Sequence, residues 1–339
     1  MELLWYVILS ILLMTYVLID GFDLGAGMAY LFIADTEDEK QKVLKSIHSI
    51  WDANEVWILA FVGVSWVVFP RYTSVLFDNF GGYILLFFLF LLFKTIFFNL
   101  TIVFKKKPLF KKIFGYVFGF INLMLVFFIS LIFANILRGI FIGQEGVNLR
   151  FVSQYFSPFT SKIGLFDWFT VLTTVMFFVF FLMHGLSWII LKNTGAFNRK
   201  LKKILQRIAF IEFILIVLFI TAWYSIHPSV YKNYWSYPFL FIFPILAFIS
   251  LFGLIAVRTY QGKNKASILS SNFIIFSWIS IIIALFPNFI MSLDNETLTV
   301  FNARFNNPES YYVKWWILVI GVILLGYSIV VHKYLKGKN

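Results

Sequence analysis

The sequence predicts an all-α membrane protein with about nine transmembrane helices. Of its 339 residues, 61% are hydrophobic and only 13% are charged, and the mean hydropathy is +0.88, far above the values of soluble domains. The charged residues form short groups between long apolar runs, which is the pattern of helices surrounded by lipid. The runs lack the alternating polarity of membrane β-strands. We therefore predict one helical membrane domain over residues 1–339.

Nine apolar runs have about the 20 residues that a helix needs to cross the hydrocarbon layer. The first run has no preceding basic segment and no small-residue cleavage site, so we expect it to be retained as a span. We expect two four-helix bundles and one peripheral helix. The predicted spans are 3–31, 50–69, 76–99, 114–137, 164–191, 208–226, 237–257, 267–287 and 312–331.

The lysines and arginines predict the orientation of these spans. Cytoplasmic loops carry an excess of positive charge. With nine spans, one set of alternate loops and the C-terminal end hold 20 of the 28 Lys and Arg residues. We therefore predict that the N-terminus lies outside and the C-terminus lies in the cytoplasm. Lys94 lies within a span, and the opposite side holds only Arg71, Arg138, Arg150, Lys162, Lys232, Arg304 and Lys314.

Ionisable side chains inside the first two spans are the main functional signal. The segment DGFDLGAG in the first span carries two aspartates, and WDANE at the start of the second span carries an aspartate and a glutamate. Gly21 and Gly25 have the spacing that lets another helix backbone approach closely. Charged groups within a span are costly and usually serve a function. In the predicted orientation both segments approach the cytoplasmic side, so we expect a proton uptake route formed by Asp20, Asp23, Trp51, Asp52, Asn54 and Glu55.

These polar residues also have plainer interpretations. Asp52 and Glu55 lie in a first helical turn, where acids often cap free backbone N–H groups. Lys94 is expected to extend toward the cytoplasmic interface, and Asn99 is a further polar residue near the same end. His184 is alone in its span, and one histidine cannot supply two axial ligands, so we expect a hydrogen-bonded buried imidazole rather than a haem ligand. Lys94, Asn99 and His184 are candidate supporting residues for the route.

Several classes of site are excluded by composition and motif. The chain has no Cys, which excludes disulfides and iron–sulfur ligation within it. It also lacks a phosphate-binding glycine loop, a zinc-binding HExxH and a serine nucleophile elbow. We expect no metal site, no bound cofactor and no catalytic residue in this chain. The net charge of +12 is explained by the basic loops, so no nucleic-acid partner is expected.

Five segments resemble, in order, motifs of subunit II of the cytochrome bd-type quinol oxidases. DGFDLGAG and WDANEVW are similar to the family's DGFDxGxG and WDGNEVW. The other segments are FPRYTSVLF, MHGLSWIILKNTG, and LFPNFIMS with TLTVFNA. The chain departs from the family at Ala53, where Gly is usual, and at Lys94 and Asn99, where Arg and an acid are usual.

The resemblance implies a haem-free, electrogenic oxidase subunit in the bacterial cytoplasmic membrane, without activity alone. Its partner would be subunit I, which carries haem b, haem d and the quinol site and reduces O2 to water. A small single-span subunit, lipids and quinone are further implied partners. The chain would support assembly and contribute to proton uptake and, in some members, to O2 access. The residues alone leave open a proton- or ion-coupled transporter that uses the same carboxylates, although transporters place such groups near the midplane between broken helices.

Overall fold

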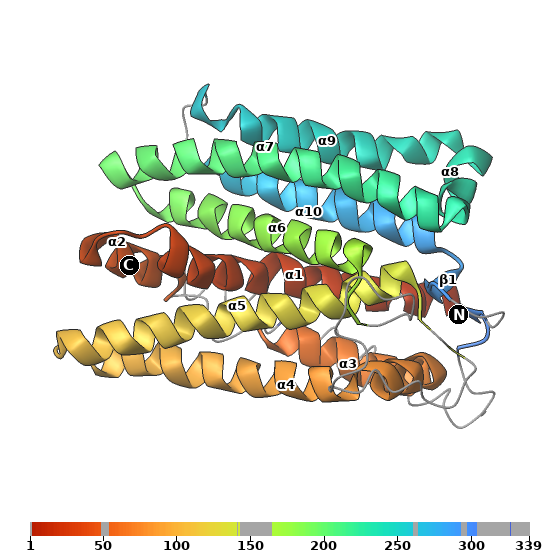
Figure 1. Cartoon of the computed structure of the whole chain (residues 1–339), viewed down its shortest axis with the longest axis horizontal. Helices are drawn as coiled ribbons and strands as arrows, with labels where there is room; N and C mark the ends of the chain where they lie inside the picture. Colours follow the sequence, from red (N-terminus) through yellow and green to blue (C-terminus); the bar gives the residue numbers. More distant parts are fainter. Residues whose placement is uncertain are drawn as a thin grey trace.

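The chain folds into a bundle of long helices that run side by side (Figure 1). The computed structural model describes residues 2–48, 54–140, 142, 165–259, 264–292, 297–303 and 326. Within this part, seven helical segments are long and apolar enough to cross a membrane, which confirms the all-helical membrane class. They are α1 (Glu2–Phe32), α4 (Pro70–Val103), α5 (Pro108–Arg138), α6 (Trp168–Lys192), α7 (Gly195–Ile226), η3 with α9 (Pro238–Ile255) and α10 (Asn264–Leu285).

Shorter elements connect the long helices. Three of them, η2, α8 and η3, lead the chain from α7 into α9, and two short antiparallel strands follow α10. The short elements are α2 (Glu37–Ile47), α3 (Val56–Val68), η2 (Pro228–Tyr231), α8 (Lys232–Ser236), η3 (Pro238–Phe241), η4 (Val257–Thr259), β1 (Asn288–Ile290) and β2 (Leu298–Thr299), with α9 itself at Ile242–Ile255.

Two of the nine predicted spans are not seen as full-length helices. The second, 50–69, corresponds to α3, which has 13 residues and is therefore about 20 Å long at the rise of an α-helix. Residues 49–53, just before it, lie outside the described part of the chain. The ninth span, 312–331, also lies outside that part, apart from Gly326. The total of nine spans therefore stays a prediction.

Two boundaries differ from the sequence prediction for local reasons. Phe69 leaves the helical region with φ −130° and ψ 62°, and Pro70 starts α4 immediately, because proline suits the first position of a helix. The predicted loop between the second and third spans is therefore absent. In the connection after α1, which we predicted as a loop, Thr36 accepts a hydrogen bond from the backbone N–H of Glu39 at 3.2 Å and starts α2. The buried side chains of α2 include Val43, Leu44 and Ile47.

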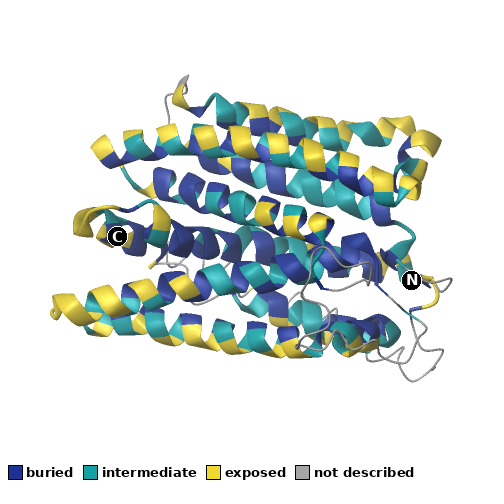
Figure 2. Cartoon of the chain, viewed as in Figure 1, coloured by how far each residue is buried: buried dark blue, intermediate teal, exposed yellow. Residues whose placement is uncertain are grey.

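The described helices form two groups that pack against each other. The first helix group consists of α1, α3, α4 and α5, and the second helix group consists of α6, α7, α9 and α10. Contacts of α6 with α1 and α5 join the groups (Figure 1). Buried residues face the interior, whereas exposed apolar residues cover the outer faces of the helices (Figure 2). Such apolar outer faces are expected where lipid surrounds a helix bundle.

Glycines allow the two helix groups to approach closely at α1 and α6. A Cβ atom on Gly25 would lie 2.0 Å from the carbonyl oxygen of Phe181, and one on Gly185 would lie 2.2 Å from the carbonyl carbon of Gly25. No side chain fits at such distances, so both positions require glycine. The close helix contact predicted from the glycine spacing is confirmed at Gly25. It fixes the DGFDLGAG segment against the MHGLSW segment of α6.

Candidate functional site

A buried ion pair forms the centre of the candidate site. The ammonium group of Lys94, on α4, donates a hydrogen bond to Oδ1 of Asp20, on α1. Asp20 is fully buried and Lys94 is 1% exposed. The prediction that Lys94 reaches the membrane interface is therefore wrong. Its long side chain turns inward because a buried carboxylate on the neighbouring helix supplies the partner that water would supply at the interface.

Asp23 and Asn54 connect the two polar segments of the sequence. The side-chain amide of Asn54 donates to Oδ2 of Asp23 at 2.8 Å and lies 3.5 Å from the carbonyl oxygen of Ile19. Asp23 is fully buried and Asn54 is also buried. The chain just before α3 is thus held against α1, one helical turn from the Asp20–Lys94 pair.

Glu55, at the start of α3, brings a third carboxyl group close to Lys94. It occupies the N-cap position of this helix but makes no side-chain capping bond, so the capping interpretation of Glu55 is wrong. Its Oε1 atom instead accepts a hydrogen bond from the Thr95 hydroxyl at 3.2 Å and lies 3.6 Å from Nζ of Lys94. Thr95 was not predicted from the sequence, because threonines within helices usually bond to their own backbone.

The carboxyl cluster, defined as Asp20, Asp23 and Glu55, contains three acids around one ammonium group. Oδ2 of Asp20 and Oδ1 of Asp23 have no hydrogen-bond partner among the described residues. An uncompensated charge in an apolar interior costs several kcal/mol. One cation compensates one carboxylate, so we expect protons to neutralise part of the remaining charge. Such protons can exchange between neighbouring carboxyl oxygens, which is the basic step of proton transfer within a membrane protein.

Figure 1 shows α2 at the end of the bundle where α1 ends. The positions of Asp20 and Lys94 along α1 and α4 place the cluster nearer to this end than to the other. Asp20 is about 18 Å along α1 from Phe32, and Lys94 is about 14 Å along α4 from Val103, at the rise of an α-helix. The neighbouring α2 carries Lys40, Lys42 and Lys45.

The described structure does not test two of the predicted route residues, and it places one of the candidate supporting residues outside the cluster. Trp51 and Asp52 lie outside the described residues, so their positions stay predictions. Asn99 is exposed, and its side-chain amide donates to the backbone carbonyl of Thr95 at 3.1 Å. Asn99 therefore lies one turn from the cluster, on the outer face of α4.

His184 is a hydrogen-bonded buried imidazole, as predicted. Its Nδ1 atom lies 2.6 Å from the Ser270 hydroxyl and its Nε2 atom 3.0 Å from the carbonyl oxygen of Leu18. The carbonyl can only accept, so Nε2 carries the proton and Nδ1 accepts from Ser270. The ring also stacks on Phe22, with centroids 4.1 Å apart. Both nitrogens are engaged, so His184 offers no free ligand to haem iron.

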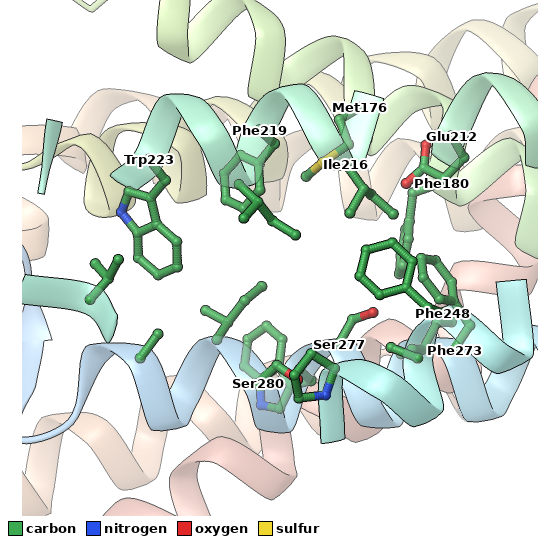
Figure 3. A pocket seen from close by; sticks show the side chains of 18 of the residues that line it. Met176, Phe180, Glu212, Ile216, Phe219, Trp223, Phe248, Phe273, Ser277 and Ser280 are labelled. Carbon is green, nitrogen blue, oxygen red and sulfur yellow. The ribbon is translucent and has the colours of Figure 1, made fainter. Parts of the chain in front are cut away.

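Another buried acid lies outside the carboxyl cluster, in the apolar surroundings of the second helix group. Glu212, on α7, is 1% exposed and lies beside a cavity of about 380 Å³ between α6, α7, α9 and α10. Figure 3 shows Glu212 toward one end of this cavity and Trp223 toward the other, with aromatic and aliphatic side chains between them. The Oε2 atom of Glu212 has no hydrogen-bond partner within the described part of the chain. Across that part, no group of three or more His, Cys, Asp or Glu residues could hold a metal ion.

Comparison with known proteins adds independent information. A family profile described as "Cytochrome bd terminal oxidase subunit II" matches residues 1–335. Cytochrome bd ubiquinol oxidase subunit 2 of Bacillus subtilis is 26% identical over 219 residues, which cover 64% of this chain and 61% of the relative. Cytochrome bd-I ubiquinol oxidase subunit 2 of Escherichia coli K12 is 29% identical over 80 residues, 24% of this chain and 21% of that protein. The matches thus span less than two thirds of these two relatives.

A longer match is found in Haemophilus influenzae. Its probable cytochrome oxidase subunit 2 is 24% identical over 279 residues, which cover 74% of this chain and 71% of the relative.

Proposed function

Because the chain belongs to the cytochrome bd terminal oxidase subunit II family, we propose that it acts as the haem-free second subunit of a quinol oxidase in the bacterial cytoplasmic membrane. Its partner, subunit I, would hold haem b and haem d and would catalyse quinol oxidation and O2 reduction. The engaged nitrogens of His184 support a haem-free role. The chain itself would be inactive alone and would contribute to assembly. The family match favours this role over the transporter alternative.

We further propose that the carboxyl cluster carries protons from the cytoplasm toward the oxygen-reducing subunit. Reduction of one O2 to two waters consumes four protons and four electrons, and two quinols supply the four electrons. The observation that carries the proposal is the gathering of two fully buried acids, Asp20 and Asp23, and the partly buried Glu55 near a single buried cation, Lys94. Protons in such a cluster can move between oxygens without creating an isolated charge.

The predicted orientation places the entry of this route at the cytoplasmic end of the bundle. Asp52 and Trp51 precede Asn54 in the sequence, so we propose that they connect the cluster to the cytoplasm. If quinol releases its protons on the opposite side, turnover moves charge across the membrane and is electrogenic.

Replacing Asp23 tests the proposed route. Asp23→Asn keeps the size of the side chain and removes its exchangeable proton. We expect O2 consumption per haem d to fall about tenfold or more, in line with the loss of a positioned acid–base group, while haem content stays normal. The measurement uses the complex purified with its native partner. Asp52→Asn is expected to lower turnover in the same way.

Glu212→Gln is the matched control, because it makes the same chemical change to a buried acid outside the route. We expect its turnover to stay within about twofold of the unmodified enzyme. Normal turnover in both Asp23→Asn and Asp52→Asn would contradict the proton route. A complex without b- and d-type haem absorption that accumulates a solute would support the transporter instead.

A further inference from the structure

Lys94 divides the three acids of the carboxyl cluster into unlike members. Its ammonium group is hydrogen-bonded directly to Asp20, whereas Oε1 of Glu55 lies 3.6 Å away. Asp23 accepts its hydrogen bond from an uncharged donor, the amide of Asn54. Attraction between charges weakens with distance and is strong in a low-dielectric interior. The cation therefore stabilises the ionised form of Asp20 more than that of its neighbours.

The Asp20–Lys94 pair is also hard to neutralise. Lys94 is 1% exposed, so protonation of Asp20 would leave a buried ammonium without its nearest anion. Removing one partner of a buried ion pair costs about 3–5 kcal/mol. Each charge thus stabilises the charged form of the other, so Asp20 resists gaining a proton and Lys94 resists losing one.

Asp23 and Glu55 are arranged differently. Asn54 satisfies one oxygen of Asp23, and the other, Oδ1, has no hydrogen-bond partner among the described residues. Oδ2 of Asp20 also lacks a partner, but a proton on Oδ1 of Asp23 leaves no ammonium group without its hydrogen-bonded anion. Glu55 accepts from a hydroxyl, and its side chain is 23% exposed, which gives it a path for exchange that the fully buried Asp20 lacks.

We infer that Lys94 is a positioning residue that keeps Asp20 as a permanent carboxylate, so that the moving protons are carried by Asp23 and Glu55. This inference rests on the proposed proton route. It gives the three acids of the carboxyl cluster different roles in that route. Two other titratable groups face the cluster from packed elements. Tyr16 is one turn before Asp20 on α1, and His184 on α6 contacts α1 beside the aspartates.

The test compares charge removal at one and at both members of the pair. The variants Lys94→Met, Lys94→Arg, Asp20→Asn and the double variant Lys94→Met with Asp20→Asn are made in the full complex. O2 consumption per haem d is measured from about pH 6 to about pH 9, a range that spans the titration of a perturbed carboxyl group. Haem content reports assembly separately from turnover.

We expect Lys94→Met to lower turnover about tenfold and to make it depend on pH, because the charge of Asp20 then lacks its compensating cation. Lys94→Arg keeps the charge and should stay within about threefold of the unmodified enzyme. The turnover of the double variant should also stay within about threefold of the unmodified enzyme, because this variant removes the anion and the cation together. Lys40→Met is the control: Lys40 is also a buried lysine, but it bonds to Tyr116 outside the cluster, and we expect normal turnover.

Two outcomes overturn the inference while the proton route stands. In the first, Asp23→Asn is slow and the double variant is as slow as Asp20→Asn alone, so Asp20 itself carries the proton. In the second, Lys94→Met loses haem but keeps normal turnover per haem, so Lys94 is only structural. If Lys94→Met does not assemble, the double variant still decides by its turnover per haem. Normal turnover in Asp20→Asn, Asp23→Asn and Lys94→Met together would instead contradict the proton route.

Discussion

The two helix groups bury acids in opposite ways. In the first helix group, Asp20, Asp23 and Glu55 are accompanied by an ammonium group, an amide donor and a hydroxyl donor. In the second helix group, Glu212 lies beside an apolar cavity, and its Oε2 atom has no hydrogen-bond partner in the described part of the chain. Both sites lie within membrane helices, so burial alone does not distinguish them.

The difference lies in what each site can do with a charge. A lone carboxyl group in an apolar site avoids the cost of ionisation by keeping its proton. A cluster with one cation can hold one carboxylate and still pass protons among the other oxygens, because no step isolates a charge. This difference supports the proposal that proton transfer takes place in the first helix group. Glu212 is the natural control in each test of that assignment.

The largest effect is expected where the two helix groups meet. In Gly25→Ala, the new Cβ would lie 2.0 Å from the carbonyl oxygen of Phe181, so the helices must separate, at a cost of about 3 kcal/mol or more. We expect the yield of haem-containing complex to fall about tenfold or more. Gly63→Ala is the control, because a Cβ at Gly63 meets nothing within 4 Å. Normal assembly of Gly25→Ala would show that the contact between the groups is dispensable.

Stability should fall when Asp20 is made apolar but should not fall when Glu212 is made apolar. Asp20→Leu leaves Lys94 without its closest anion and should destabilise the complex by about 3–5 kcal/mol. Glu212→Leu removes a carboxyl oxygen without a bond and should be neutral or stabilising by about 1–3 kcal/mol. The measurement is the thermal unfolding midpoint of the purified complex. Each variant is the control of the other, and shifts of the same sign would contradict the comparison.

The sequence predicted the helical class and the importance of the DGFDLGAG segment for clear physical reasons. Long apolar runs leave a membrane helix little alternative, and the spacing of Gly21 and Gly25 predicted a close helix contact that the structure confirms at Gly25. The meeting of Asn54 with Asp23 follows from the antiparallel order of the first two predicted spans. These features depend on local composition and chain direction, which a sequence contains.

The details of the candidate site depend on packing, which a sequence does not contain. A long lysine side chain can reach either an interface or a buried anion, and only the position of α4 against α1 decides this for Lys94. The bond from Thr95 to Glu55 is similar, because it depends on how α4 is rotated. The short helix α2 could have been predicted, since Thr36 and Glu39 have the spacing of an N-terminal capping motif.

A smaller effect is expected at His184, which packs on α1 from the second helix group. His184→Phe preserves a ring against Phe22 but loses the hydrogen bonds to Ser270 and to the Leu18 carbonyl. We expect a loss of about 1–3 kcal/mol in stability, since a buried carbonyl then lacks its donor. Haem content per assembled complex should be unchanged. Ser270→Ala, which removes one of the two bonds, should have a smaller effect. Loss of a haem band without loss of assembly would make His184 a ligand.

The smallest effect is expected at an ion-pair cluster near water, between α2 and α7. Lys200 lies 2.7 Å from Asp35 and 2.6 Å from Glu39. Partial burial acts to raise the pKa of Glu39, but the hydrogen bond from Lys200 and those from backbone N–H groups outweigh it, so the pKa lies below the usual value of 4.5. A lowered pKa means that this stabilisation is present above that value and is lost as the pH falls through the folded-state pKa.

Glu39→Gln should therefore lower the free energy of unfolding slightly near neutral pH, by less than about 1 kcal/mol, and the difference from the unmodified enzyme should shrink in acid. Added salt should also reduce it, because salt screens accessible charges. The buried Asp20–Lys94 pair should respond little to salt, since its side chains are almost inaccessible. Asp38→Asn is the control, because Asp38 pairs with Lys42 on the exposed face of α2. Equal salt sensitivity of the two sites would mean that water reaches Lys94, and the argument for a permanently ionised Asp20 would then lose its basis.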